Sequence, residues 1–208
     1  MSTISRKPII VVIGQSGAGK DTSYTILEQQ LCLPAQNVKF VKPFKEAMAN
    51  YLGVALEMLE DRVYRNQILP ELGCSPLDLM VRGFKHMPNI HPELGIYYTR
   101  RQVQSVFEND QIPIFTDCRN PAEIGFISQL TQEGHKLYTV HLVRSDLDLI
   151  ESDLHLPSNS RQLRLLSSHY LMTPNNGTKE DLAESLTQLS GAVNWHIRCS
   201  RYGSSVAS

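Results

Sequence analysis

The chain has 208 residues, of which 41% are apolar and 20% charged, and its 21 acidic and 20 basic residues leave a net charge of −1. This size and composition indicate one globular domain and exclude a disordered chain. The near-zero charge weighs against a partner held mainly through phosphate-backbone electrostatics, although a local basic groove stays compatible with it.

Neither a disulfide framework nor a membrane span is indicated. The four cysteines are far apart and form no C-x-x-C pair: Cys32, Cys74, Cys118 and Cys199. We therefore expect reduced thiols, as in cytosolic proteins. The longest aliphatic run, Ile9–Ile13, is far shorter than the roughly 20 residues that cross a bilayer. We expect a cytoplasmic protein, in the host cytoplasm if the chain is viral, that contacts no membrane.

Strand-like and helical segments alternate along the chain. The β-branched run Ile9–Ile13 predicts a strand buried on both faces, and helix 22–31 follows it. Further strands are predicted over 37–41, 112–117, 137–143 and 169–172. Further helices are predicted over 43–52, from Ser75, over 96–107, from Asn120 to Gln132 and from Thr178. This alternation predicts an α/β fold with a five-stranded parallel sheet flanked by helices.

Two stretches depart from the alternation. Residues from about 54 to 108 show no strand pattern and read as a helical insert between β-units. Residues from about 144 to 167 are polar and read as an excursion or lid, and Gly203–Ser208 as a frayed tail. We expect one domain over 1–208, because neither stretch has the features of a domain of its own.

The first strand ends in a glycine-rich turn with a lysine, the strongest functional signal in the sequence. Gly14, Gly17 and Gly19 let the backbone turn tightly and approach a phosphate closely, and the following helix adds its positive end. Lys20 supplies a point charge for the β/γ-phosphates. The predicted nucleotide-binding residues are Gly14, Gln15, Ser16, Gly17, Ala18, Gly19, Lys20, Asp21 and Thr22. The alternative is a glycine-rich turn without a ligand.

The residue after the lysine differs from the usual phosphate-loop pattern. A Ser or Thr normally follows and holds Mg²⁺, whereas Asp21 takes that place here and Thr22 comes next. Asp21 can reach the metal or its waters, and Thr22 can contact a phosphate.

With this variant the sequence resembles the P-loop nucleoside monophosphate kinase group. It is most similar to the phage deoxynucleoside monophosphate kinases and the related phage kinases that phosphorylate 5-hydroxymethyluracil within DNA. Lys42–Met48 resembles the family's Pro-x-Lys helix start, and Ile114–Glu123 resembles its strand ending in Asp-x-Arg. The resemblance implies a P-loop kinase fold with a helical acceptor-binding insert and a short lid, and ATP and Mg²⁺ as cofactors.

Two polar residues lie at the end of the third predicted strand. Asp117 can reach Mg²⁺ through water, or it caps the next turn. Arg119 lies where ligands of open α/β sheets gather, and it can bind a phosphate or stabilise the moving phosphoryl group; the alternative is an exposed salt bridge. Lys20, Asp117 and Arg119 are our candidate catalytic residues.

The residues expected to bind the phosphate acceptor are supported less directly by the sequence. The resemblance implies an acceptor role for Lys45 and a lid role for Arg144, Arg161 and Arg164, although all four also fit a solvated basic surface. Arg101, beside Arg100, Tyr97 and Tyr98, can clamp a base and its phosphate or simply lie on an amphipathic helix. The family's Arg-x-x-x-Gln pair has become Leu77 and Val81, with Arg82 adjacent as the remaining candidate.

These observations leave several functions open. The first is transfer of phosphate from ATP to a free deoxynucleoside monophosphate, and the second is transfer to a modified base in phage DNA, which needs a groove for a flipped nucleotide. A small-molecule kinase and a non-catalytic nucleotide-binding module are further alternatives. Oligomeric state is not predicted.

Overall fold

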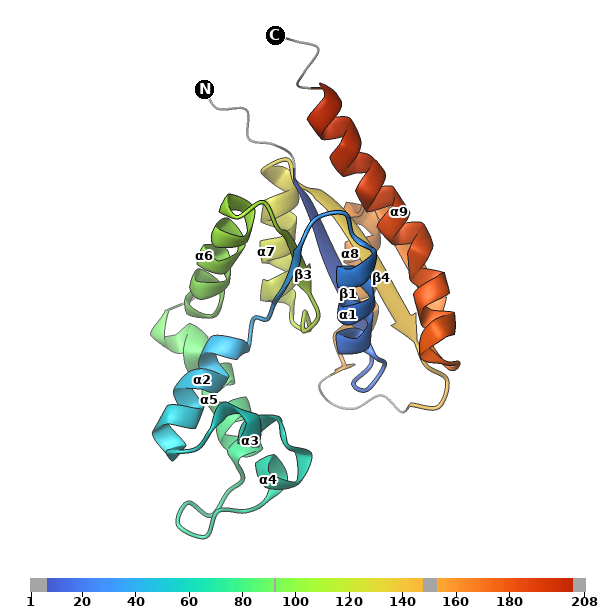
Figure 1. Cartoon of the computed structure of the whole chain (residues 1–208). Coiled ribbons are helices and arrows are strands. Elements are labelled where there is room, and N and C mark those ends of the chain that lie inside the picture. Colours follow the sequence, from blue (N-terminus) through green and yellow to red (C-terminus); the bar gives the residue numbers. More distant parts are fainter. Residues whose placement is uncertain (1–6, 92, 148–152, 204–208) are drawn as a thin grey trace. The chain divides into compact units, whose positions relative to one another are not determined.

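The computed structural model describes residues 7–91, 93–147 and 153–203 (Figure 1). The predicted tail beyond Gly203 and part of the predicted lid, residues 148–152, lie outside the described residues. The chain divides into two compact units: one holds the residues up to Lys39 and from Gln102 onward, and the other is Phe40–Arg101. Each unit is described by itself.

The first unit is built on a five-stranded sheet. Its strands are β1 (Pro8–Gly14), β2 (Ala35–Val38), β3 (Ile112–Phe115), β4 (Lys136–Val143) and β5 (His169–Pro174). The order is β2-β3-β1-β4-β5, and every neighbouring pair is parallel. The α/β fold with a five-stranded parallel sheet that the sequence predicts is therefore confirmed.

The bounds of β2 and β3 differ from the predictions by two or three residues. The second strand runs over Ala35–Val38, not 37–41, because Lys39 leaves the sheet to pair with Asp21. The third strand ends at Phe115, two residues early, because the Thr116 hydroxyl turns to the side chains of Asn37 and Asp21. Both strands therefore end in polar contacts near the phosphate loop.

Helices cover both faces of this sheet (Figure 1). All of β1 is buried, and its alternate residues Ile10 and Val12 share one hydrophobic cluster with α1 (Lys20–Gln30) and α9 (Lys179–Gly203). On the other face, α7 (Pro121–Gln132) packs through Phe126 against Phe115, and α8 (Leu156–Leu166) packs on β1, β4 and α7. Burial on both faces explains why β1 is aliphatic throughout.

Local caps fix where several helices begin. Asn120 and Glu123 form a capping box at the start of α7, as the sequence predicts. Thr178 accepts the Asp181 amide at the start of α9, whose Leu182, Leu186 and Leu189 are buried as expected from their spacing.

The described part of the predicted lid contains a helix. In its described part, residues 156–166 form α8, whose Leu163 is fully buried. The end of this helix is fixed to the sheet by a 2.7 Å hydrogen bond between the hydroxyls of Ser167 and Thr139. This part of the excursion therefore packs on the sheet, and its role as a lid stays a prediction.

The second unit is helical. It contains α2 (Lys42–Leu52), α3 (Leu56–Glu60), α4 (Arg62–Asn66), α5 (Pro76–Ile90) and the first part of α6 (Leu94–Glu108). Ala49, Leu59 and Met80 form the buried centre of its core. Ser75 and Asp78 make the predicted capping box of α5, which gives that helix a firm start. The short helices α3 and α4 lie in the stretch of about 54–108 that the sequence analysis reads as helical without separate helix bounds.

Among the described residues, every helix is too short or too polar to cross a lipid bilayer.

Candidate active site

The phosphate loop joins β1 to α1 in the first unit. Gly14, Gly17 and Gly19 have φ values of +154°, +85° and +91°, which side chains disfavour. A Cβ at Gly14 would lie 2.7 Å from the carbonyl oxygen of Leu142 on β4, so the loop also has no room for one. Strand, glycine turn and helix thus occur in the predicted order, which is the order that a phosphate-binding loop requires.

Lys20 is the first residue of α1, and its side chain folds back over the loop. Its Nζ donates to the carbonyl oxygens of Gly14 at 2.8 Å and Gln15 at 2.7 Å. Burial, followed by repulsion from Arg119, lowers the pKa of Lys20 to about 8, against the opposing pull of nearby carboxylates. This amine is therefore poised to change its charge close to physiological pH.

Asp21 occupies the place of the usual magnesium-binding hydroxyl. Its Oδ1 lies 2.9 Å from Nζ of Lys39 and accepts from the Thr116 hydroxyl at 3.4 Å. Burial raises the pKa of Asp21, but the hydrogen bond and charge of Lys39 outweigh it and leave a net lowering. The side chain is 75% exposed. A charged, accessible carboxylate beside the loop suits a Mg²⁺ ion that keeps most of its waters.

Asp117 fits the same role less directly. Asp117 follows β3 and the phosphate loop follows β1, so both lie at the carboxyl edge of the parallel sheet. The charge of Asp117 also acts on Lys20. Among the described residues no group of three or more His, Cys, Asp or Glu side chains could hold a metal ion by itself. Asp21 and Asp117 therefore fit a metal that is held mainly by water and by phosphate oxygens.

The backbone of Arg119 is held from two sides, while its side chain is exposed. Its amide donates to Oε2 of Glu123 at 2.5 Å, and its carbonyl accepts from Nδ2 of Asn159 on α8 at 2.7 Å. Glu123 and Asn159 are both buried, at 5% and 3% exposure. The charge of Arg119 also acts on Lys20. The structure thus brings Lys20, Asp117 and Arg119 together as the sequence analysis grouped them.

A buried carboxylate lies on the phosphate loop itself. The amide of Ser16 donates to both oxygens of Asp153, at 3.2 and 3.1 Å, and Asp153 is 4% exposed. The Gln15 side chain donates to the carbonyl of Leu147 at 3.0 Å. The segment after β4 therefore contacts the loop at two points.

The loop is also braced from the end of β5. Nδ2 of Asn175 donates to the carbonyl of Ala18 at 2.7 Å, and the Asn175 amide donates to Val143 on β4 at 2.9 Å. A Cβ at Gly19 would lie 2.5 Å from Asn175 Nδ2, so this close approach needs a glycine there. Asn175 thereby ties the phosphate loop to the two neighbouring strands.

The predicted lid arginines have other contacts in this conformation. Arg144 makes a bidentate pair with Asp146, with Nε to Oδ1 at 2.9 Å. Arg161 and Arg164 lie on the exposed face of α8, and the Arg164 guanidinium lies 6.0 Å from the ring centre of Tyr170 on β5. The phosphate-binding roles of Arg144 and Arg161 stay predictions.

The remaining predicted acceptor residues belong to the second unit. Lys45 on α2 pairs with Glu60 on α3, with Nζ to Oε1 at 2.6 Å. Arg82 on α5 and Arg101 on α6 are exposed. Their acceptor roles stay predictions.

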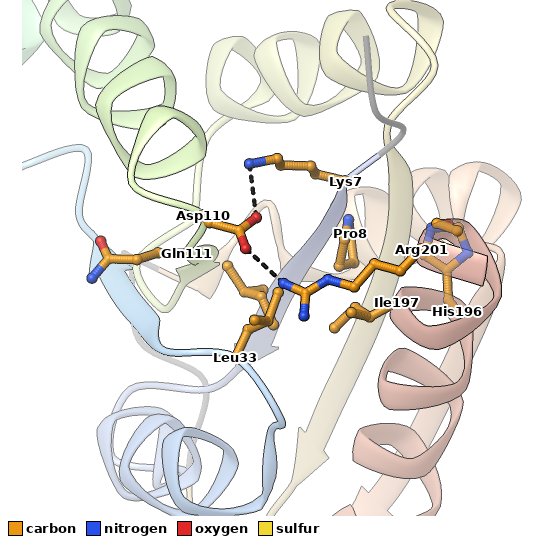
Figure 2. Close-up of a pocket in the computed structure, with 10 residues that line it drawn as sticks. Lys7, Pro8, Leu33, Asp110, Gln111, His196, Ile197 and Arg201 are labelled. Atoms are coloured by element: carbon orange, nitrogen blue, oxygen red, sulfur yellow. Dashed lines mark hydrogen bonds and ion pairs between the residues drawn. The ribbon is translucent and has the colours of Figure 1, made fainter. Parts of the chain in front are cut away.

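A small cavity of about 40 Å³ lies near the amino ends of β1 and β3, the edge of the sheet opposite the phosphate loop. Figure 2 shows Asp110 there between Lys7 and Arg201. The Asp110 carboxylate lies 3.2 Å from Lys7 Nζ and 2.6 Å from Arg201 Nη2. This network ties the start of β1 to the end of α9. The charged residues that line the cavity already pair with one another, which favours a structural role.

Sequence reasoning missed Asp153, Asn159, Lys39 and Asn175. Asn175 could have been found from the sequence, because it directly follows β5. The other site residues also follow the carboxyl ends of parallel strands, where ligands bind in such sheets. Asp153 and Asn159 lie in the polar excursion, where only the folded chain shows which polar residues reach the loop.

The comparisons with known proteins concern the fold. No protein-family model matches the sequence, and no curated protein matches it. The structure is similar to a sugar kinase from Janibacter sp., 16% identical, over 90% of this chain and 98% of that one, with a TM-score of 0.45. It is also similar to a shikimate kinase from Aquifex aeolicus (15% identity, 88% and 96% covered, TM-score 0.41). A gluconokinase from Sinorhizobium meliloti gives 12% identity, 93% and 97% covered, and a TM-score of 0.44.

Proposed function

We propose that the protein is an ATP- and Mg²⁺-dependent phosphotransferase that acts on a nucleotide. The observation that carries this proposal is the grouping of Asp21, Asp117 and Arg119, whose charges act on Lys20, at a glycine loop that leads directly into α1. Phosphoryl transfer needs positioning and charge neutralisation more than covalent chemistry, so glycines, a lysine, carboxylates and an arginine suffice.

Each residue has a distinct part in this proposal. The loop amides and Lys20 bind the β- and γ-phosphates of ATP, and Arg119 faces the transferred group, where its fixed charge stabilises the transition state. Asp21 and Asp117 would hold the waters of a bound Mg²⁺, which would neutralise charge on the phosphates. Asn175 and Lys39 keep the loop and Asp21 in place.

For the acceptor we propose a free deoxynucleoside monophosphate, in line with the resemblance of the Gly-Lys-Asp-Thr loop, the Pro-x-Lys helix start and the Asp-x-Arg strand end to phage monophosphate kinases. The second unit carries nearly equal numbers of acidic and basic residues. That balance favours a small acceptor over a long nucleic-acid track.

One observation favours a second acceptor, a hydroxymethylated base within DNA. Leu77 on α5, which stands where the monophosphate kinases carry an arginine, packs into the hydrophobic core of the second unit. Val81, in the place of the glutamine, is 58% exposed. Neither can bind a monophosphate by a polar contact, so the acceptor contacts must differ from those of the family.

The test is transfer from γ-labelled ATP with Mg²⁺ to a panel of acceptors. The panel holds the deoxynucleoside and ribonucleoside monophosphates, simple sugars and shikimate, and duplex DNA with and without 5-hydroxymethyluracil. We expect label in a free deoxynucleoside diphosphate. Label that appears only in modified DNA would show that the hydroxymethylated base is the acceptor. Label that appears only in a sugar or in shikimate would contradict a nucleotide acceptor. If no label is transferred at all, the kinase function is contradicted.

A further inference from the structure

The phosphate loop in this structure already holds an anion, which is part of the chain. Both oxygens of the Asp153 carboxylate lie 3.1–3.2 Å from the amide nitrogen of Ser16. Ser16 is in the middle of the loop, between Gly14 and Gly17, where backbone amides bind phosphate oxygens in proteins with this motif. A carboxylate and a phosphate offer the same kind of charged oxygen acceptor to such an amide.

The burial of Asp153 shows that this contact is built into the fold. Aspartate is almost never fully buried unless it is paired, because removing its charge from water is costly. Asp153 is only 4% exposed, and its charge acts on that of Lys20. Ser16 and Lys20 thus compensate the buried carboxylate with the groups that would otherwise serve a phosphate.

Two other polar groups of the loop are also bonded within the protein, and not to a ligand. Lys20 Nζ is satisfied by the carbonyls of Gly14 and Gln15, and the Gln15 side chain is satisfied by the Leu147 carbonyl. One amide hydrogen cannot serve the Asp153 carboxylate and a phosphate oxygen at once with full strength. Phosphate binding at Ser16 therefore requires the carboxylate to leave.

We propose that Asp153 is an internal competitor for the phosphate loop, which occupies the Ser16 amide in the nucleotide-free protein and must be displaced by a phosphate group of the nucleotide. This inference rests on the proposed function, because it assumes that the loop binds phosphate. Its consequence is an autoinhibitory contact: the affinity for nucleotide is reduced by the fraction of molecules in which Asp153 occupies the loop.

The test is the affinity of the full chain for Mg·ATP and for pyrophosphate, measured by calorimetry for the wild type, Asp153→Asn and Asp153→Ala. Asp153→Asn keeps the shape and removes the charge, and Asp153→Ala removes the acceptor altogether. We expect both variants to bind the two ligands about tenfold more tightly than the wild type, since the competing fraction is lost. Glu184→Gln is the matched control, because it removes one negative charge at an exposed position of α9, and its affinity should equal that of the wild type.

Each outcome decides between the alternatives. Unchanged affinity in both Asp153 variants overturns the inference, and weaker binding also overturns it, because Asp153 would then organise the loop for phosphate. If neither the wild type nor any variant binds either ligand, the proposed function fails and this inference with it. A structure of the wild type with ATP checks the contact without a variant. We expect the Ser16 amide to donate its hydrogen bond to a phosphate oxygen of ATP in that structure. A Ser16 amide that still donates to the Asp153 carboxylate would contradict the inference.

Discussion

At the level of single residues, the environment of Lys20 couples its charge to pH. Burial and the neighbouring Arg119 lower its pKa to about 8, so the lysine is charged below this pH in the free protein and neutral above it. A bound polyphosphate favours the charged form, which means that binding above pH 8 must take up a proton.

We therefore predict that affinity for Mg·ATP is nearly constant from pH 6.5 to 7.5 and weakens above pH 8, by at most about tenfold per pH unit. Calorimetry in buffers of different ionisation enthalpy measures the proton uptake directly. Lys20→Arg keeps its charge at all these pH values, so its affinity, even if weaker, should not show this step. A wild-type affinity that is flat from pH 7 to 9.5 contradicts the prediction.

Glu123 is a second residue whose burial has a measurable cost. Burial raises its pKa to about 7, and the charge of Asp117 adds to this, against the backbone amides of Arg119 and Asn120 that favour the ionised form. The folded state therefore holds a proton between pH 4.5 and 7 that the unfolded chain releases, so this carboxyl makes the protein less stable as the pH rises through that window.

We predict that Glu123→Gln removes this dependence. The free energy of unfolding of the wild type relative to the variant should fall by up to about 3 kcal/mol from pH 4.5 to pH 7, because one pKa unit corresponds to about 1.4 kcal/mol. Urea unfolding at pH 5, 6, 7 and 8 measures it, with the exposed Glu184→Gln as control. Parallel pH profiles of the wild type and Glu123→Gln would show that Glu123 does not titrate in this range.

At the level of elements, α8 contributes Asn159, whose side chain fixes the backbone of Arg119 by a hydrogen bond. Asn159 lies on its buried face and donates to the Arg119 carbonyl, 40 residues away in the chain. Without this amide the carbonyl loses its partner, which costs about 1–3 kcal/mol, and the Arg119 backbone is freed on one side. Asn159 thus acts through Arg119 as a positioning residue.

We predict that Asn159→Ala lowers kcat for phosphoryl transfer by about tenfold and leaves KM for ATP nearly unchanged, because the lost interaction serves the transition state. In an Arg119→Ala background the same change should have no further effect on kcat. Gln162→Ala, on the exposed face of the same helix, is the control. Additive effects of the two substitutions would show that Asn159 does not act through Arg119.

In the second unit, α2 and α5 pack closely at a glycine. A Cβ at Gly83 would lie 2.4 Å from Cζ of Phe44, whereas a Cβ at Gly95 on α6 would meet nothing within 4 Å. We predict that Gly83→Ala destabilises this unit by about 1–3 kcal/mol through overpacking. Gly95→Ala should be neutral or stabilising by up to about 1 kcal/mol, because alanine favours the helix. Hydrogen exchange of the α5 amides measures both, and equal protection in the two variants contradicts the prediction.

Elements whose signals are local could be predicted from the sequence. The strand-turn-helix of the phosphate loop and the caps at Ser75, Asn120 and Thr178 were all predicted, since each depends on a few neighbouring residues. The packing of α8 on the sheet and the Asp153 contact could not be, because they join segments more than 100 residues apart or bury polar residues that look exposed in the sequence. The end of β2 was misplaced because Lys39 is drawn to Asp21, a tertiary contact.

For the whole molecule, the first unit contains the complete proposed ATP site, with Lys20, Asp21, Asp117 and Arg119. The predicted acceptor residues Lys45, Arg82 and Arg101 belong to the other unit. The prediction of a single domain over 1–208 with an insert at about 54–108 stays a prediction, and the compact second unit begins earlier, at Phe40. If these assignments hold, Lys45, Arg82 and Arg101 bind the acceptor from a different unit than the one that holds the phosphate loop.

The most direct test of the proposed kinase activity is transfer of label from γ-labelled ATP to a deoxynucleoside monophosphate by the wild type and by Lys20→Ala. We expect transfer by the wild type and a loss of at least about 100-fold in the variant, because Lys20 provides charge at the transferred phosphate. Lys85→Ala, which removes an exposed lysine of α5, should keep the wild-type rate. A Lys20→Ala protein that transfers label as fast as the wild type would contradict the assignment of the phosphate loop.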